Sequence, residues 1–271
     1  MTSRPTRLRL LGAEVDLVTP DEVLSTVDGF VRERRSAVIA NHNAHSLYLM
    51  KRSKDFQAFY ADADLIQVDS TPMIAWGRML GLPLEQKHRS TYLDWRDRFW
   101  ALANARKWRV FYLGGAPGVA ERACEKLKAE FPATTLACQN GYFDMSPDSA
   151  ENQSVLARIK AFRPDIIFVG MGMPRQEAWI RQNRAALTSG VLFSVGAAYD
   201  YEGGAQIAAP RWMGRIGLEW LFRLVSQPGR LAFRYLVEPW SLVPLALDDL
   251  KRHRPIQTPV SATAVVMTAQ D

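Results

Sequence analysis

Cysteine is scarce in this chain of 271 residues, with Cys124 and Cys138 as the only two. Two cysteines cannot build a disulfide framework or a zinc site made of cysteines alone, so we expect a reducing compartment. An apolar signal core is also missing, because the basic N-terminal segment MTSRPTRLRL is soon followed by GAEVD. These two absences favour a cytoplasmic protein.

Long apolar runs are absent as well. In the aromatic-rich region near the C-terminus, the longest run covers residues 231–247 and is interrupted by Arg234, Glu238 and two prolines. A helix that spans a membrane needs about 20 consecutive apolar residues, so this region does not provide one. The chain is nevertheless long enough to bury a substantial core, and we expect a core with an appendage.

Positive charge is concentrated near the C-terminus. Between Arg211 and Arg254, eight lysines and arginines face four acids, so this stretch carries +4 of the net charge of +6. Six aromatic residues lie in the same stretch, a mixture typical of short helices on an anionic membrane surface. An ordinary helical subdomain with a basic face explains the composition equally well. Nucleic acid is a weaker option, because no motif of a nucleic-acid-binding module is present.

Short apolar runs alternate with helical patterns along the first 200 residues. Five of these runs lead through a turn into a helix-like segment and one leads through a loop, which is the pattern of a βα repeat. We therefore predict an α/β protein with a Rossmann-like, doubly wound, mainly parallel sheet. The runs cover residues 37–40, 65–68, 110–113, 135–138, 166–169 and 191–195.

The predicted organisation has three parts. Residues 1–210 form the α/β core. Residues 211–254 form a basic, aromatic-rich helical appendage. Residues 255–271 are rich in Thr, Val and Ala and are expected to be a flexible tail.

The segment VGMGMPRQEAW, residues 169–179, is the most informative part of the chain. It follows a buried strand, and Gly170 and Gly172 allow backbone to approach a ligand. Pro174 suits the first turn of a helix, whose free amides attract an anion. Gln176 and Glu177 are placed to recognise the polar edges of a base or a sugar. The alternative is an ordinary Gly-Pro turn with a solvated helix start.

Other polar or glycine-rich segments follow the remaining strands, and carboxyl ends of parallel strands share one edge of a sheet. The loop with Gly114, Gly115 and Gly118 opens a helix and suits a nucleotide. It lacks the GxGxxG order, and no acid follows the next strand, so a dinucleotide-dependent dehydrogenase is disfavoured. Asn41 and Asp69 follow two further runs.

Asp69 has two interpretations, as an N-cap of the following helix or as a general base. His42 and His45 lie three residues apart. No clustered carboxylates accompany them, so we predict no metal site, and His42 is expected in the wall of the site.

With these residues in place, the chain resembles the WecG/TagA/CpsF family, glycosyltransferase family 26. The similarity covers roughly residues 12–236, and its most specific segment is GLEWLFRLVSQPGR at residues 217–230. The other segments are VGMGMPRQEAW at residues 169–179, LGGAPGVAE at residues 113–121 and GYF at residues 141–143.

The resemblance implies an inverting, metal-independent and cofactor-free transfer of a hexose or N-acetylhexosamine-type sugar. The donor is a UDP-sugar, and the acceptor is an undecaprenyl-diphosphate-linked sugar at the inner face of the cell membrane. The product serves bacterial cell-surface polysaccharide or exopolysaccharide synthesis, and the enzyme is peripheral on an anionic membrane surface. The oligomeric state stays open and includes a homo-oligomer. A non-catalytic nucleotide-binding protein of the membrane surface is the alternative.

The resemblance implies that residues 1–210 are the catalytic core that binds the nucleotide-sugar, and that the appendage at residues 211–254 binds the membrane. It also assigns roles to single residues. Asp69 matches the catalytic aspartate and Arg89 an active-site arginine, while Arg223 and Arg230 match appendage arginines that complete the site over the diphosphate. Asn41 belongs to the same site, although the family often has Thr-x-Asn where this chain has Asn-His-Asn. Such an inverting transfer needs only one base, and arginines with helix N-termini can stabilise the departing UDP.

Overall fold

The computed structural model describes residues 5–253, except for the side chains of Arg211 and Arg215. Arg254 and the predicted tail at residues 255–271 lie outside the described residues.

Six strands form one all-parallel sheet in the order β4-β3-β8-β7-β5-β6. All six predicted runs are strands, so the predicted α/β fold with a parallel sheet is confirmed. The strand at residues 65–68 has the predicted bounds, and the other strands differ by one or two residues at their ends. The strands are β3 (Ala37–His42), β4 (Leu65–Val68), β5 (Arg109–Gly114), β6 (Thr135–Gln139), β7 (Ile166–Gly170) and β8 (Val191–Ser194).

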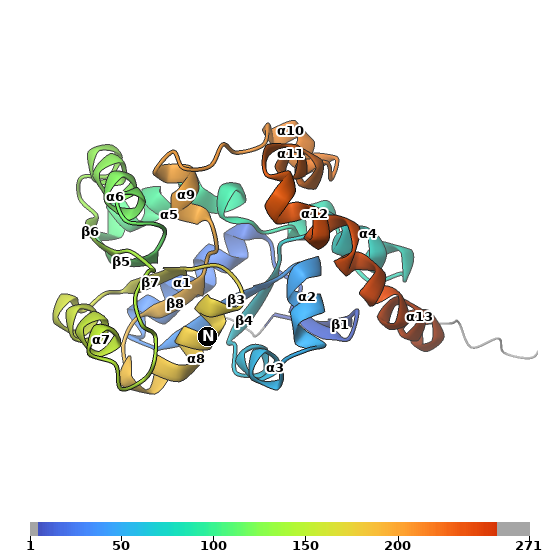
Figure 1. Ribbon diagram of the computed structural model, residues 1–271, viewed down its shortest axis with the longest axis horizontal. Coiled ribbons are helices and arrows are strands. Elements are labelled where there is room, and N and C mark those ends of the chain that lie inside the picture. The colour runs from blue at the N-terminus through green and yellow to red at the C-terminus, as the bar shows by residue number, and fades with distance from the viewer. Residues whose placement is uncertain (1–4, 254–271) are drawn as a thin grey trace, which may run out of the picture.

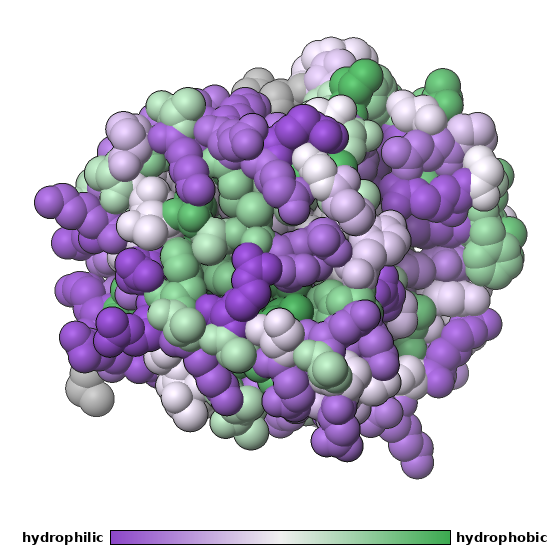
Figure 2. All heavy atoms as spheres, turned by 60° about the vertical axis from the view of Figure 1, so that its left-hand side comes forward, coloured by the Kyte–Doolittle hydropathy of each residue, from purple (hydrophilic) through white to green (hydrophobic). Residues whose placement is uncertain are grey.

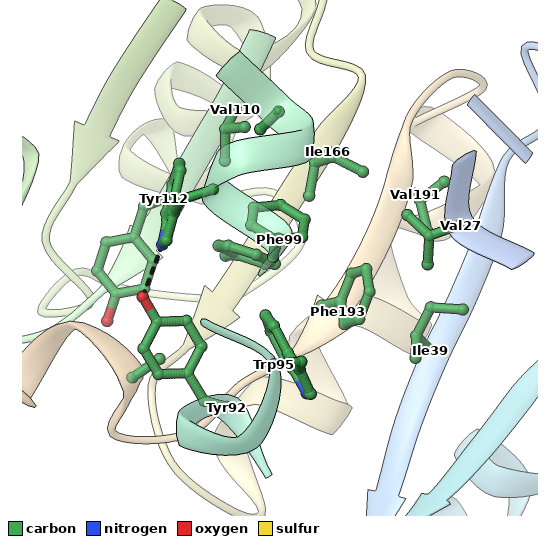
Figure 3. Packing of buried hydrophobic residues seen from close by; sticks show 14 of the residues in the cluster. Val27, Ile39, Tyr92, Trp95, Phe99, Val110, Tyr112, Ile166, Val191 and Phe193 are labelled. Atoms are coloured by element: carbon green, nitrogen blue, oxygen red, sulfur yellow. Dashed lines mark hydrogen bonds between the residues drawn. The ribbon is translucent and has the colours of Figure 1, made fainter. Parts of the chain in front are cut away.

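Helices cover both faces of this sheet (Figure 1). Side chains alternate along each strand, so Ile166 faces one helical layer and Ile167 the other. In the first layer, Trp95 and Phe99 pack over Phe193 of the sheet (Figure 3). The first layer consists of α1 (Pro20–Arg32), α5 (Tyr92–Arg106) and α6 (Val119–Glu130), and the second of α3 (Lys54–Ala61), α7 (Ala150–Phe162) and α8 (Arg175–Asn183).

The strand order creates a switch point in the middle of the sheet. The chain leaves β5 toward β6 on one side, whereas it leaves β7 toward β8 on the other side, and β5 and β7 are neighbours. Open α/β sheets bind ligands in the crevice outside the carboxyl ends of two such strands.

An antiparallel hairpin of β1 (Arg7–Leu10) and β2 (Ala13–Asp16) precedes the core. Both residues between the strands have positive φ, which suits a tight hairpin turn. Asp16 is buried, accepts two hydrogen bonds from the Arg7 guanidinium at 2.8 and 2.9 Å, and accepts a third from the backbone amide of Ile66 at 2.7 Å. The hairpin is thereby joined to β4.

The C-terminal part is helical, as predicted, and lies beside α2 (Ala44–Met50) and α4 (Thr71–Met79) (Figure 1). Asp249 accepts hydrogen bonds from the Leu11 amide at 2.7 Å and from Trp76 Nε1 at 3.2 Å. Within residues 5–253, no helix is both long and apolar enough to cross a membrane. The appendage consists of α10 (Arg211–Arg215), α11 (Glu219–Ser226), α12 (Pro228–Leu236), η3 (Glu238–Leu242) and α13 (Val243–Arg252).

Candidate active site

Three neighbouring strands bring polar side chains together at their carboxyl ends. Asp69 follows β4, and its Oδ2 accepts a hydrogen bond from Asn41 Nδ2 at 3.3 Å. The Oδ1 atom of Asn41 in turn accepts from Ser194 Oγ of β8 at 3.2 Å. Asn41 and His42 were expected after the strand, but both belong to β3, because they pair with β4.

Asp69 is not the N-cap of α4. Ser70 occupies that position, and neither residue caps the helix with its side chain among the described contacts. Burial raises the pKa of Asp69 from 3.8 to about 7, although the nearby Arg89 guanidinium opposes the rise. A carboxylate with such a pKa is well matched to proton transfer near neutral pH.

Arg89 lies beside Asp69 because its backbone runs next to the end of β4. A bridge joins Val68 to Arg89, directly after η1 (Gln86–His88). The Arg89 side chain is only 9% exposed, and its Nη2 atom donates to Glu219 Oε2 at 2.5 Å. Glu219 opens α11, so this ion pair ties the appendage to the predicted catalytic centre. Glu219 was not among the site residues predicted from the sequence.

A cavity of about 460 Å³ surrounds this centre and is lined by Asp69, Arg89 and two appendage arginines, Arg223 and Arg234. The Nε atom of Arg223 is buried without a hydrogen-bond partner among the described residues, which leaves a donor available to a ligand. Burial lowers the pKa of Arg234. Sequence reasoning missed Arg234, although it lies one helical turn after Arg230.

Arg230 lines a different cavity, of about 650 Å³, at the switch point between β5 and β7. Arg223 and Arg230, which were predicted to act on one diphosphate, therefore lie on two cavities that share the α11–α12 segment. The second cavity is also lined by Gly115, Gly170, Gly172, Gly196, Tyr142, Arg175, Asp200, Gln206 and residues 227–229.

Not every predicted glycine lines this cavity. Gly114 is required by strand packing, because a Cβ atom there would lie 2.3 Å from the carbonyl oxygen of Gly170. Gly118 is the N-cap residue of α6, with a φ of 80°. Pro174 was expected in the first turn of α8 but is its N-cap residue, after a cis Met173–Pro174 bond.

Gln176 and Glu177 lie beneath the second cavity, and neither side chain is exposed. Gln176 Oε1 accepts a hydrogen bond from the Gly196 amide at 3.1 Å, and its Nε2 donates to Glu177 Oε1 at 2.7 Å. This pair holds the turn after β8 in place. Direct recognition of a base or sugar, as predicted for these two residues, requires their rearrangement.

The two histidines do not form a metal pair. His42 is fully buried and stacks on Tyr60, with ring centroids 3.7 Å apart. Its Nδ1 atom lies 2.8 Å from Ser46 Oγ, and burial lowers the pKa of its imidazole to about 3. His42 lines neither cavity. The Nδ1 atom of His45 lies 2.7 Å from Glu238 Oε2. Residues 5–253 contain no group of three His, Cys, Asp or Glu suited to a metal ion.

A glycine-lined cavity at the switch point of a parallel sheet suits a nucleotide ligand, and an aspartate of raised pKa with arginines around it suits a general base beside an anionic group. Residues 8–255 match the model of the glycosyl transferase WecG/TagA/CpsF family, and the chain belongs to this family. It is therefore a glycosyltransferase, which argues against the non-catalytic alternative.

The chain is similar to enzymes of Staphylococcus aureus named N-acetylglucosaminyldiphosphoundecaprenol N-acetyl-beta-D-mannosaminyltransferase. It is 28% identical to that of strain MW2 over 239 residues, which cover 84% of this chain and 88% of the relative. It is also 28% identical to that of strain NCTC 8325 / PS 47 over 231 residues, with coverage of 82% and 85%.

Proposed function

We propose that this glycosyltransferase moves a hexose or N-acetylhexosamine-type sugar from a UDP-sugar to an undecaprenyl-diphosphate-linked acceptor, with inversion and without a metal. The product belongs to a bacterial cell-surface polysaccharide or an exopolysaccharide. The observation that carries this proposal is the position of Asp69, in a cavity with three arginines that shares the α11–α12 segment with a glycine-lined cavity. The names of the similar S. aureus enzymes support a lipid-diphosphate acceptor.

The donor binds in the cavity at the switch point. Backbone around Gly115 and Gly172 lets the nucleotide approach closely, and the Asp200 carboxylate accepts hydrogen bonds from ribose hydroxyls or the uracil N–H. Arg230 and the first amides of α12 face the UDP diphosphate, because cationic forks and helix N-termini favour phosphate oxygens. UDP thus lies between the sheet and the appendage.

The acceptor binds in the cavity that contains Asp69. Its hydroxyl oxygen attacks the anomeric carbon of the donor sugar and forms the new C–O bond, while the bond from that carbon to the UDP diphosphate oxygen breaks. Asp69 takes the hydroxyl proton, and UDP leaves with the electron pair. A direct displacement on the opposite face inverts the anomeric centre, and one carboxylate suffices because no covalent intermediate forms. The arginines stabilise the leaving charge.

The appendage holds the enzyme on the inner face of the cell membrane. Of the fifteen large hydrophobic side chains that are exposed in the described residues, twelve lie between Trp212 and Leu250. On the opposite side, which carries α6 and α7, hydrophilic side chains surround a band of hydrophobic ones (Figure 2). Exposed apolar groups on short helices, next to Lys251 and Arg252, fit an anionic bilayer surface.

The test uses purified protein, a panel of UDP-sugars that includes UDP-N-acetylmannosamine, and N-acetylglucosamine linked through a diphosphate to a polyprenyl chain. We expect one UDP-sugar to give a disaccharide-lipid product with inverted anomeric configuration. Failure of every UDP-sugar to give a product with this acceptor and with other lipid-diphosphate-linked sugars would refute the proposed reaction.

A further inference from the structure

The cavity that contains Asp69 has two ends of different chemistry. One end carries the carboxylate and the guanidinium groups of Arg223 and Arg234. The other end is apolar and lies among β1–β2, α4, η3 and α13. Its lining includes Leu11, Met73, Trp76, Leu242, Val243 and Ala246. A ligand that fills the whole cavity must therefore be amphiphilic.

The apolar end is rigidly built. Asp249 is 2% exposed, and one of its oxygens accepts from both the Leu11 amide and Trp76 Nε1, at 2.7 and 3.2 Å. Two elements of the wall, the β1–β2 turn and α4, are thereby fixed to α13, which carries Asp249. Met73 is 2% exposed, so the floor is part of the packed core. These hydrogen bonds and the packed floor hold the walls of the apolar end together.

The apolar end is continuous with the exposed apolar surface of the appendage. Val243 lines the cavity and is also 45% exposed. Trp240, 75% exposed, precedes it in η3, and Leu247, 53% exposed, follows one turn later in α13. A chain that leaves the cavity past Val243 passes directly onto the surface that we assign to the membrane.

We propose that this apolar end binds the first prenyl units of the acceptor lipid. The inference rests on the proposed function, because such an acceptor has a sugar on one side of a diphosphate and a prenyl chain on the other. With the diphosphate at Arg223 and Arg234 and the sugar hydroxyl at Asp69, the prenyl chain points into the apolar end. A volume of about 460 Å³ suits a small part of the lipid, so the rest of the chain stays in the bilayer.

The acceptor sugar does not fit the apolar end as well as a prenyl chain does. A sugar hydroxyl loses free energy when it is buried without a hydrogen-bond partner. Leu11, Met73 and Ala246 offer no side-chain donor or acceptor there, and Trp76 Nε1 already donates to Asp249. Apolar burial instead favours a hydrocarbon, and the gain grows with each methylene group that leaves water.

Chain-length dependence tests this inference without a membrane. Transfer is measured with two water-soluble acceptors that carry the same sugar diphosphate, one esterified with methyl and the other with a geranyl chain of two prenyl units. We expect the KM of the wild type to be at least about tenfold lower for the geranyl acceptor, because the apolar end buries its carbons. Ala246→Phe fills the apolar end of the cavity. It should bring the ratio of the KM for the methyl acceptor to the KM for the geranyl acceptor close to one.

Leu247→Phe is the matched control, because Leu247 is the neighbouring residue but does not line the cavity, and it should keep the wild-type ratio. If Ala246→Phe does not fold, Val243→Gln can be used instead. It places a polar side chain where the apolar end opens to the surface and should lower the same ratio of KM values. Equal KM values for both acceptors in an active wild type, or an unchanged ratio in Ala246→Phe, would show that the apolar end does not bind the prenyl units. The proposed reaction would remain intact. Absence of transfer to any acceptor would instead count against the proposed reaction.

Discussion

At the scale of single residues, the reactivity of Asp69 depends on its charged neighbours. Burial raises its pKa to about 7, Arg89 and Arg223 oppose the rise, and Glu219 adds to it. Glu219 also holds the Arg89 guanidinium at 2.5 Å. The appendage therefore adjusts the acidity of the proposed base through one carboxylate.

Glu219→Gln should lower the pKa of Asp69, because it removes a nearby negative charge while Arg89, which also pairs with Asp94 at 3.5 Å, stays beside Asp69. A base must be deprotonated, so activity falls as the pH drops through its pKa. We expect the acidic limb of kcat/KM against pH to move to lower pH in Glu219→Gln, by about half a unit or more. Asp248→Asn removes an exposed appendage carboxylate and should leave the limb in place. An acidic limb at the wild-type pH in Glu219→Gln would show that Glu219 does not influence the pKa of Asp69.

The sequence allowed Asp69 to be selected as a candidate, because it directly follows an apolar run and matches a family motif. Glu219 lies in the GLEWLFRLVSQPGR segment of the same family, but its contact with Arg89 could not be predicted from that segment. It meets Arg89 across 130 residues of chain, and no local pattern encodes such a contact. Gln176 and Glu177 show the opposite error, since a polar helix start predicted exposure where the structure has a buried hydrogen-bonded pair.

At the scale of elements, apolar runs predicted the strands because five of the six are mostly buried between two helical layers. The edge strand β6 buries only Leu136. The hairpin was missed, since RLRL and AEVD are four-residue strands without an apolar run. The end of β3 was misplaced, because Asn41 and His42 are held in the sheet by pairing with β4 and not by hydrophobicity. Local sequence thus predicts buried strands better than it predicts strands, or strand ends, that are held by pairing with a neighbouring strand.

The α11–α12 segment presents Arg223 and Arg230 to different cavities, so we expect their substitutions to affect different substrates. Arg230→Ala should raise the KM of the UDP-sugar about tenfold to a hundredfold, in line with the loss of a charged hydrogen bond. Arg223→Ala should chiefly impair the acceptor KM and kcat. The comparison uses initial rates with each substrate varied in turn. Identical effects of both variants on both substrates would contradict the separation of the two cavities.

At the scale of the whole molecule, charge and exposed apolar area gather at one end. Replacement of Lys251 and Arg252 by Gln should weaken binding to anionic liposomes, because each basic residue near such a surface contributes about 1 kcal/mol. The contribution should fade with salt. Turnover of a water-soluble acceptor should not change, since neither residue lines either of the two cavities described above. Sedimentation with liposomes at two salt concentrations measures the effect, and unchanged sedimentation of the double variant would contradict the assigned surface.

Chelation tests the proposed metal-free chemistry of the whole enzyme. The arginines of the two cavities supply the positive charge that the departing diphosphate needs, so we expect transfer to continue at a similar rate after dialysis against EDTA. A loss of activity that only Mg²⁺ or Mn²⁺ restores would show that this charge comes from a metal ion.

Asp69→Asn tests the central claim most directly, with transfer rate and thermal stability measured on the same preparation. An amide cannot take the acceptor proton, so kcat should fall about 10²-fold to 10⁴-fold. Because burial raises the pKa of Asp69 above 3.8, the folded protein loses stability as pH rises from about 4 through 7. The variant avoids this loss, so its Tm should exceed that of the wild type by a few degrees at pH 8, with a smaller difference at pH 5. A variant that folds and transfers sugar at nearly the wild-type rate would show that Asp69 is not the base.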